Sequence, residues 1–461
     1  METFAETLAS FATALCPARV PPDVAAQAAR LLLDTAGVTL AAVPEDFAAS
    51  MHAVARRLGG PREASLWGAR EQVGMAAAVL ANGTLAHGHD YDDTLEEAIV
   101  HTGSCCVTAA LAAGEARHAS GGEVLAAIVA GVEVMAAVGR VCPGAFHRRG
   151  FHPTALCGSF GAAAATGRLL GLTADELATA FGLCGSQASG IIEYLADGTW
   201  TKRLHAGWAA HAGVVATHLA QVGFTGPRTV FEGVHGFYQG FGGERPDAGR
   251  LAALTAGLGR DWAIQQLMFK AYPCGSINQP YMDCAARIRA HPDFDPAAIR
   301  AIVCRTAEGP VHRLWEPLAE KHRPTTSYGA KFSLPYCIAL VLVEGQAGVD
   351  GFSEARTRDP RILGVAGKVG YVVDPMLPYP QRFTGHVRVE LANGRVLEET
   401  QDAPRGGPAH PLAPEELHEK FRVNAARVLP VAEVDALLER LLTIAEADDV
   451  APIAAALRRP A

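Results

Sequence analysis

The spacing of apolar residues along the chain predicts helices over residues 20–265. A helical apolar pattern begins after Pro21 and Pro22, a residue type that is favoured in the first turn of a helix. Residues 120–123 and 173–176 each match the capping box, in which a hydroxyl and a later carboxylate bind free backbone N–H groups. An apolar run of helical length follows both boxes, so we predict an α-rich domain.

The most apolar stretch of the chain, residues 124–139, contains a single charged residue, Glu133. A membrane-spanning helix needs about 20 predominantly apolar residues, so this stretch is short for a bilayer. We therefore predict a buried helix of a globular domain.

The pattern changes after about residue 270. Residues 302–304 (Ile-Val-Cys) are typical of a strand. Apolar and polar residues alternate over 387–391 and 395–398, on either side of Asn393 and Gly394. This arrangement predicts a β-hairpin with a type I′ turn.

A helical pattern returns from Pro414 to about Leu442. We predict a mainly α fold in which a large all-helical domain comprises residues 1–267 and 401–461. A smaller α+β domain, residues 268–400, is inserted between these two parts. A chain of 461 residues is too long for one compact core, which agrees with two domains.

Composition and charge narrow the class of protein. Hydrophobic residues make up 49% of the chain and charged residues 19%, which is typical of a folded globular protein. The net charge of -8 argues against nucleic-acid binding, which usually needs a basic surface. Small anionic substrates remain compatible with this charge, because a basic pocket can form locally in an acidic protein.

The first 15 residues contain Glu2 and Glu6 and lack the basic start of a secretory signal. The ten cysteines include no CxxC spacing. We expect a cytoplasmic protein with reduced cysteines, and neither a membrane nor a nucleic acid as its partner.

Titratable residues are dense at residues 87–94, which hold two histidines and three aspartates, and His101 follows shortly. Such groups in an Ala-rich region need water, partners or a function. One interpretation is a solvated loop that caps helices through Asp93 and Thr94. The other is a binding or catalytic site.

A metal site is a third interpretation of this segment, because His87, His89 and Asp90 are similar in spacing to the ligands of metallohydrolases. Those motifs normally follow a strand, whereas residues 75–81 have a helical composition. We therefore expect no metal here.

His152 lies before Pro153, whose ring restricts the backbone of the preceding residue. A histidine held in this way can point into a cleft, although a packed or solvent-facing side chain is the commoner outcome. The small residues of 158–167 lack the glycine spacing of phosphate-binding loops, so we interpret them as part of a closely packed helix.

Basic side chains gather at two further segments. Residues 202–205 hold three of them, including Lys202 and Arg203, and Lys270 lies at the predicted domain junction. Solvated surface charge is the simple interpretation, but small apolar neighbours favour a pocket for Lys202. Two lysines that reach one cleft would suit a ligand with several carboxylates. The segment that ends in Tyr336 adds another lysine, a serine and a phenol.

Together these segments resemble the MmgE/PrpD family over about residues 5–445. The motifs occur in the family's order, and the ordered set is far more specific than any single motif. They are residues 82–94, 150–153, 197–207, 270–274 and 330–336. The resemblance implies a large all-helical domain, a smaller α+β lid domain and a homodimer.

The family's members include 2-methylcitrate dehydratase, cis-aconitate decarboxylase and iminodisuccinate epimerase, and the resemblance implies chemistry without a metal or organic cofactor. In the decarboxylase branch, active-site positions fall on residues that match Asp90, Thr94, His101, His152, Lys202, Lys270 and Tyr336 here. The chain departs from the family at residues 275–279, where members often carry a histidine. This departure leaves the substrate open.

The charges and the resemblance predict a lyase that moves a proton next to a carboxylate of a small di- or tricarboxylic acid. Lys202 and Lys270, with Arg203, would bind the substrate carboxylates. His101 or His152 would exchange the proton, because imidazole titrates near neutral pH.

The remaining predicted site residues would support this reaction. Asp90 would orient a histidine, Thr94 and Tyr336 would donate hydrogen bonds, and His87 would help to bind the substrate. We expect dehydration ahead of decarboxylation, with epimerisation as an alternative outcome of the same site. A metal-dependent hydrolase and a non-catalytic helical binding protein are the rival classes.

Overall fold

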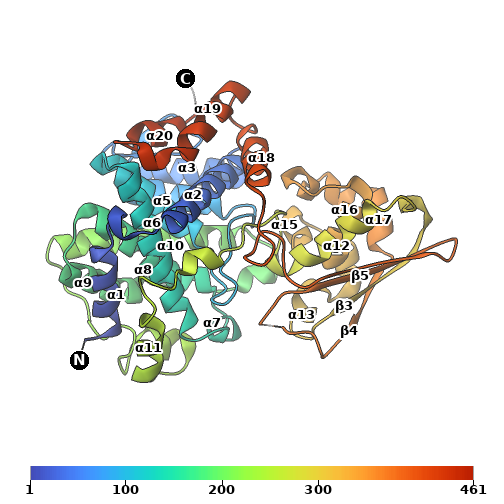
Figure 1. Cartoon of the computed structure of the whole chain (residues 1–461), viewed down its shortest axis with the longest axis horizontal. Helices are drawn as coiled ribbons and strands as arrows, with labels where there is room; N and C mark the ends of the chain where they lie inside the picture. Colours follow the sequence, from blue (N-terminus) through green and yellow to red (C-terminus); the bar gives the residue numbers. More distant parts are fainter. Residues whose placement is uncertain (1, 380, 460–461) are drawn as a thin grey trace. The chain divides into compact units, whose positions relative to one another are not determined.

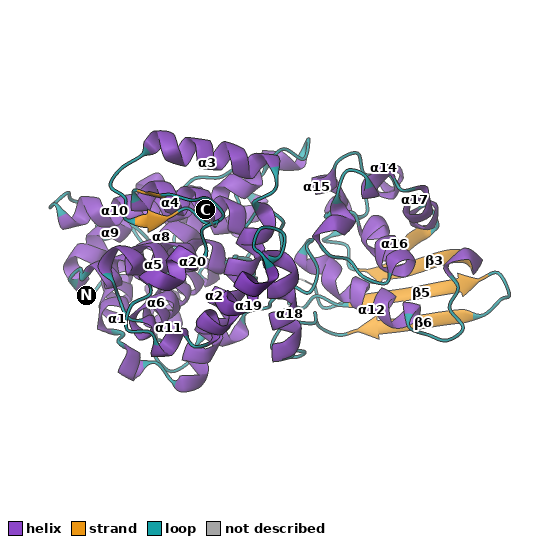
Figure 2. Cartoon of the chain, turned by 90° about the horizontal axis from the view of Figure 1, so that it is seen from above, coloured by secondary structure: helices purple, strands orange, loops and turns teal. Residues whose placement is uncertain are grey.

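The computed structural model describes residues 2–379 and 381–459, which form two compact units. The larger unit comprises Met1–Gly88, Asp92–Leu267 and Ala413–Ala461. The smaller unit comprises His89–Tyr91 and Met268–Leu412. Helices dominate the described residues (Figure 2), which confirms the predicted mainly α fold.

The larger unit is built mainly from helices (Figure 1). It also has one two-stranded antiparallel sheet. Its elements are α1 (Phe4–Ala14), α2 (Pro22–Ala42), α3 (Asp46–Leu58), β1 (Ala64–Ser65), β2 (Gln72–Val73), α4 (Met75–Ala86), α5 (Gly103–Arg117), α6 (Gly121–Arg140), α7 (Ala145–Arg148), α8 (Pro153–Leu170), α9 (Ala174–Gln187), α10 (Thr201–Gln221), α11 (Ala248–Thr255), α18 (Pro414–Ala425), α19 (Val431–Leu442) and α20 (Ala451–Ala456).

Small residues let the central helices pack closely. Helix α10 packs against both α4 and α8, and a Cβ atom on Gly207 would lie 2.1 Å from the carbonyl oxygen of Leu80. Only glycine allows α10 to approach α4 so closely. Gly158 and Gly161 of α8 likewise leave no room for a Cβ atom beside the thiols of Cys105 and Cys106. The prediction of a closely packed helix at 158–167 is confirmed.

Helix α6 explains the apolar stretch interrupted by Glu133. Among the described helices it alone is long and apolar enough to cross a membrane, but 89% of its most apolar window is buried inside the protein. The prediction of a buried helix is therefore confirmed. The Glu133 carboxylate accepts backbone N–H groups of Ala263 and Ile264, both at 3.0 Å. Burial raises the pKa of Glu133 to about 7.

The two predicted capping boxes differ in the structure. Thr173 and Glu176 form both reciprocal hydrogen bonds at the start of α9, as predicted. At α6, the Ser120 hydroxyl accepts the N–H of Glu123 at 3.3 Å. The Glu123 carboxylate pairs instead with Arg168 at 2.6 Å, so this second box is only half formed.

The smaller unit combines helices with a four-stranded sheet of order β4-β3-β5-β6. Strand β3 is parallel to β4 and antiparallel to β5, which is antiparallel to β6. Helix α12 packs against β5 and β6 (Figure 2). The elements are α12 (Gln279–Arg289), β3 (Ile299–Thr306), α13 (Val311–Leu314), α14 (Leu318–His322), α15 (Ser327–Ala330), α16 (Leu334–Glu344), α17 (Pro360–Ala366), β4 (Val369–Val373), β5 (Gly385–Leu391) and β6 (Val396–Gln401).

Strands β5 and β6 form the predicted hairpin, but the predicted turn type is wrong. A type I′ turn needs positive φ at both central residues. Gly394 has φ +84°, whereas Asn393 is not among the described residues with positive φ. The N–H of Gly394 donates to Leu391 O at 2.9 Å. The turn is therefore centred one residue before the predicted pair, Asn393 and Gly394.

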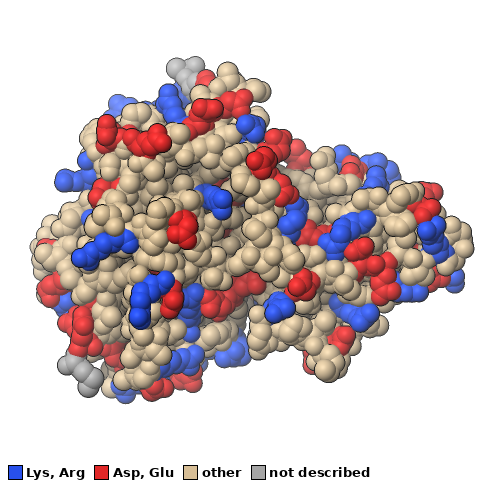
Figure 3. Space-filling view, in the orientation of Figure 1, with Lys and Arg blue, Asp and Glu red and all other residues tan. Residues whose placement is uncertain are grey.

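The C-terminal helical pattern is two helices, α18 and α19, that are separated at Pro430. Lys420 on α18 pairs with Asp34 on α2 at 2.7 Å, and both side chains are buried. This ion pair fastens the C-terminal part of the chain to an N-terminal helix of the same unit. On the outside, acidic and basic side chains are interspersed over the face shown in Figure 3.

Candidate active site

The segment that follows α4 is buried, so the interpretation of a solvated loop is wrong. His87 is fully buried and its Nδ1 lies 2.8 Å from Oδ2 of Asp92, which is also buried. A carboxylate only accepts hydrogen bonds, so the neutral ring of His87 carries its hydrogen on Nδ1 and a lone pair on Nε2. Within residues 2–379 and 381–459, His87 Nε2 has no hydrogen-bond partner.

Asp93 caps the start of α5. Its carboxylate accepts the N–H of Thr102 at 2.9 Å, the hydroxyl of Thr102 at 2.7 Å and the N–H of Gly103 at 2.8 Å. Burial, and then the neighbouring Asp92, raise the pKa of Asp93 to about 7. The capping role predicted for Asp93 is confirmed, whereas the solvation predicted with it is not.

His101 has a fixed ring orientation. Its Nδ1 donates to the carbonyl oxygen of Asp93 at 2.7 Å and lies 3.3 Å from Oγ1 of Thr94. The same Nδ1 lies 3.7 Å from Oδ1 of Asp92. Because a carbonyl oxygen only accepts, the hydrogen of the neutral ring lies on Nδ1 and the lone pair on Nε2. The predicted residues Thr94 and His101 therefore lie together.

His152 occupies the N-cap position of α8, as its place before Pro153 predicts. Its own N–H donates to Gly190 O at 2.9 Å, which fixes the backbone beside the helix. The ring is buried, and its centroid lies 5.5 Å from that of His87 and 6.2 Å from that of His101. Three histidines from separate segments thus form one cluster.

The basic segment of α10 is also buried, so the interpretation of solvated surface charge is wrong. Lys202, Arg203 and His205 each expose only 6% of their surface. His205 Nδ1 lies 3.2 Å from Nδ1 of His152, and the two ring centroids are 5.3 Å apart. Burial, and then the charges of Lys202 and other imidazoles, hold the pKa of His152 well below its usual value. Burial, His87 and Lys202 lower the pKa of His205 to about 4.

Arg203 has a packing role within the larger unit. Its Nε donates to Gly88 O at 2.9 Å, and its guanidinium lies 4.4 Å above the centre of the Phe47 ring. The hydrogen bond joins α10 to the end of α4, and the cation–π contact joins α10 to α3. Substrate binding by Arg203 stays a prediction.

Two predicted residues form an ion pair in the smaller unit. Lys270 is fully buried, and its Nζ donates to Oδ1 of Asp90 at 2.6 Å and to the carbonyl oxygen of Asp90 at 2.8 Å. Asp90 has φ +55°, a left-handed conformation that aspartate tolerates better than most residues. Tyr336, on α16, donates its hydroxyl to Gly351 O at 2.8 Å. Their roles in catalysis stay predictions.

Residues 275–279 hold polar side chains that are engaged with the backbone. Asn278 is buried and donates to Lys331 O at 3.0 Å. Gln279 is buried and bonds both the N–H and the carbonyl oxygen of Tyr272. Where family members often carry a histidine, this chain therefore has two side-chain amides that are hydrogen-bonded to the backbone.

The three clustered histidines are also candidate metal ligands. Ring nitrogens of His87, His101 and His152 lie within 4.8 Å of one another. The nearby ammonium of Lys202, whose charge lowers the pKa of His152, makes this environment unfavourable for a dication. The arrangement fits a metal-free acid–base site better than a metal centre.

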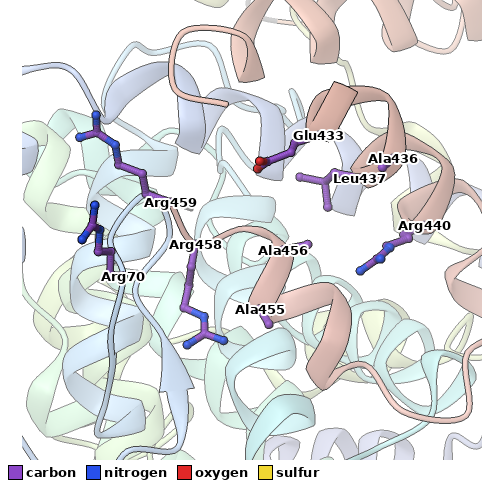
Figure 4. A pocket seen from close by; sticks show the side chains of 9 residues that line it. All are labelled: Arg70, Glu433, Ala436, Leu437, Arg440, Ala455, Ala456, Arg458 and Arg459. Carbon is purple, nitrogen blue, oxygen red and sulfur yellow. The ribbon is translucent and has the colours of Figure 1, made fainter. Parts of the chain in front are cut away.

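A pocket of about 300 Å³ lies elsewhere in the larger unit and contains none of the predicted site residues. Residues of α19 and α20 and residues near these helices line it. The charged side chains of this lining are Arg70, Glu433, Arg440, Arg458 and Arg459. The guanidinium groups of Arg70 and Arg458 point in opposite directions (Figure 4). An anion site needs cations that point toward one ligand, and these two arginines do not.

Sequence reasoning missed three residues of the cluster: Asp92, Tyr194 and His205. Asp92 is hydrogen-bonded to His87. The centroid of the Tyr194 ring lies 5.9 Å from that of His205 and 6.4 Å from that of His152. Asp92 and His205 stand inside motifs quoted for the family resemblance, so the motifs held the signal. Nothing in the sequence distinguished Tyr194.

Comparison with known proteins identifies the family. The MmgE/PrpD N-terminal domain matches residues 6–248, and the MmgE/PrpD C-terminal domain matches residues 272–444. The chain belongs to the MmgE/PrpD family. The resemblance inferred from the ordered motifs is thereby confirmed.

Three relatives show the range of the similarity. The chain is 28% identical to "Cis-aconitate decarboxylase-like protein oryM" of Aspergillus oryzae (strain ATCC 42149 / RIB 40), over 97% of this chain and 96% of that protein. It is 27% identical to the cis-aconitate decarboxylase of Homo sapiens, over 98% and 94% respectively. It is 26% identical to the 2-methylcitrate dehydratase of Cupriavidus necator, over 60% of this chain and 58% of that protein.

Proposed function

We propose that this MmgE/PrpD protein is a lyase that acts on a small di- or tricarboxylic acid by transferring a proton next to a carboxylate. One observation carries the proposal: the larger unit buries a cluster of four imidazoles, those of His87, His101, His152 and His205, with the buried ammonium group of Lys202 in electrostatic reach of two of them. The names of the relatives support the same class of reaction.

The imidazoles supply the proton transfer. Hydrogen bonds from Nδ1 orient His87 and His101, and the low pKa of His152 keeps that ring neutral at pH 7. A neutral imidazole can act as a base through one nitrogen and return a proton through the same atom. Positioned acid–base catalysis contributes about 10² to 10⁴-fold, so charge stabilisation must supply the rest.

Lys202 supplies the positive charge. Its charge lowers the pKa of both His152 and His205, which places it within electrostatic reach of both rings. In a buried site this ammonium would bind a substrate carboxylate and stabilise negative charge that develops next to it. The predicted counterpart, Lys270, lies in the smaller unit and is paired there with Asp90.

We place decarboxylation ahead of dehydration, which reverses the order expected from the sequence. The relatives matched over nearly their whole length are named cis-aconitate decarboxylase or cis-aconitate decarboxylase-like protein, whereas the dehydratase match covers 60% of this chain. Epimerisation by the same groups stays the alternative. The amides at residues 275–279 favour a substrate that differs from those of members with a histidine there.

A panel of di- and tricarboxylates, incubated with the enzyme in D₂O, tests the proposal. Release of CO₂ identifies a decarboxylase and release of water a dehydratase. Deuterium incorporation with neither product identifies an epimerase. If no acid of the panel exchanges a proton or yields a product, the proposed function is wrong.

Two variants test the cluster itself, His152→Ala and Lys202→Ala. Each should lower kcat/KM at least about 100-fold, because each removes a group that acts on the transition state. His218→Ala is the matched control, since His218 lies exposed on the same helix as Lys202. Undiminished activity in both site variants would refute the assignment.

The rival metal-dependent hydrolase is tested directly. Elemental analysis of the purified protein and turnover after treatment with a chelator should give substoichiometric metal and unchanged activity. Stoichiometric metal, with activity lost to the chelator and restored by the metal, would favour the rival class.

The predicted homodimer and the predicted lid role of the smaller unit stay proposals. Three large apolar side chains at four-residue spacing are exposed at the start of α10: Trp200 at its N-cap, and Leu204 and Trp208 on the helix. Such a stripe on a helix supports burial against a second copy of the chain. Trp208→Glu should then convert dimers to monomers in light scattering, and a monomeric wild-type protein would exclude the homodimer.

A further inference from the structure

The proton position is fixed on two of the clustered histidines and open on a third. His87 and His101 each direct Nδ1 at an oxygen that can only accept, so each neutral ring carries its hydrogen there. His152 instead directs Nδ1 at another imidazole nitrogen, Nδ1 of His205, at 3.2 Å. Two neutral imidazole nitrogens that face each other share one hydrogen. The ring that holds it therefore decides which nitrogen of the other is protonated.

The geometry points to His205 as the positioning residue that sets whether His152 meets the substrate as a base or as an acid. This inference rests on the proposed lyase function. When the shared hydrogen lies on His152 Nδ1, Nε2 of His152 bears a lone pair and can accept a proton. When it lies on His205 Nδ1, neutral His152 carries its hydrogen on Nε2 and can donate it.

The proton transfer balances within the pair. The lone pair of His152 Nε2 forms a bond to the proton of the substrate carbon, and the electrons of the C–H bond stay on the substrate. The Nδ1 hydrogen of His152 then passes to the lone pair of His205 Nδ1, so the positive charge moves to His205. The reverse sequence returns a proton to carbon, and no further reactant is required.

The surroundings favour moving the charge away from His152. The titratable side chains beside its ring are His87 at the end of α4, His101 ahead of α5, Lys202 and His205 on α10, and Tyr194 on the 3₁₀ helix Glu193–Leu195. The Asp92 carboxylate lies behind them, against His87 and His101. Burial, and then the charges of Lys202 and of the neighbouring imidazoles, lower the pKa of His152 well below its usual value. His205 exposes 6% of its surface and His152 only 2%, so His205 keeps more contact with water and the pair carries its charge more easily there.

Two substitutions separate positioning from packing. His205→Leu removes the facing nitrogen, whereas His205→Asn keeps an amide near the position of Nδ1 that can hydrogen-bond to His152 but cannot take up its proton, so it restores only the positioning part of the role. His205→Leu should lower kcat about 10- to 100-fold with little change in KM. If that loss is near 100-fold, kcat of His205→Asn should be about tenfold higher than kcat of His205→Leu. His218→Leu, on the exposed face of the same helix, is the control and should change neither constant.

Both variants should also shift the acid limb of the pH profile upward, because a group that lowers the pKa of His152 is removed. A purely structural role would lower the melting temperature without moving this limb. Equal loss in the two variants with an unmoved limb would overturn the inference, and so would wild-type kinetics in both.

A readout without substrate keeps the inference separate from the proposed function. In protein labelled with ¹⁵N-histidine, the two nitrogen signals of His152, assigned by their loss in His152→Gln, report which nitrogen is protonated. We expect partial protonation of both nitrogens in the wild type and a different distribution in His205→Leu. Identical His152 signals in the two proteins would overturn the inference, whereas failure of every acid in the D₂O panel would overturn only the proposed function.

Discussion

Acid should destabilise the protein through His205 in a way that one substitution can isolate. The pKa of this buried imidazole is about 4 in the folded protein and 6.5 in its reference state. Because the folded-state pKa is lowered, the unfolded chain binds more protons between these two values. The free energy of unfolding therefore falls as the pH drops from 6.5 towards 4, and the contribution is intact above pH 6.5.

The size of the effect follows from the two pKa values. Protonation of His205 favours the unfolded chain by about 2 to 3 kcal/mol more at pH 4.5 than at pH 7.5. His205→Asn does not titrate in this range and keeps hydrogen-bonding atoms near Nδ1. The variant should therefore lose about 2 to 3 kcal/mol less than the wild type over the same pH change.

Urea unfolding at pH 7.5 and at pH 4.5, followed by tryptophan fluorescence, measures this difference. Acid effects that both proteins share cancel in the comparison, and His218→Asn controls for the loss of an exposed histidine. Equal losses in His205→Asn and in the wild type would refute the reasoning, because His205 would then titrate alike in the folded and unfolded chains.

Substitutions test three buried contacts of the fold. Glu133→Leu should cost about 2 to 6 kcal/mol in urea unfolding, because two buried N–H groups lose their acceptor, and Glu133→Gln should cost less. Lys420→Met should cost about 3 to 5 kcal/mol by leaving the Asp34 carboxylate buried without its cation, and adding Asp34→Leu should recover part of that loss; a loss under 1 kcal/mol would contradict a buried pair. Tyr336→Phe should cost about 1 kcal/mol, because the Gly351 carbonyl loses its donor. A simultaneous fall in turnover would show that this hydroxyl also serves the substrate, whereas no change in stability would contradict the hydrogen bond.

The elements that the sequence predicted best are those whose signals are local. The capping box at residues 173–176, the buried helix around Glu133 and the hairpin at residues 387–398 each depend on residues close in the chain. The turn type failed because a hairpin's backbone angles depend on how the strands close, which the pair Asn393-Gly394 does not fix alone.

Burial was the property that the sequence predicted least well. The segments at 87–94 and 202–205 are polar enough to be solvated, yet both are buried, because their neighbours in space are elements distant in the chain. Buried polar groups need partners, and those partners are non-local, as the approach of His205 to His152 illustrates.

The sequence by itself determined the mainly α fold, the family and most members of the histidine cluster, because ordered motifs and helical periodicity are written in consecutive residues. Only the tertiary structure decided which oxygen accepts the hydrogen bond of each histidine ring and which ring nitrogen holds the hydrogen. Those properties depend on distances of about 3 Å between individual atoms, two of them within the segment between α4 and α5 and one between α8 and α10, and the packing of the whole unit sets such distances.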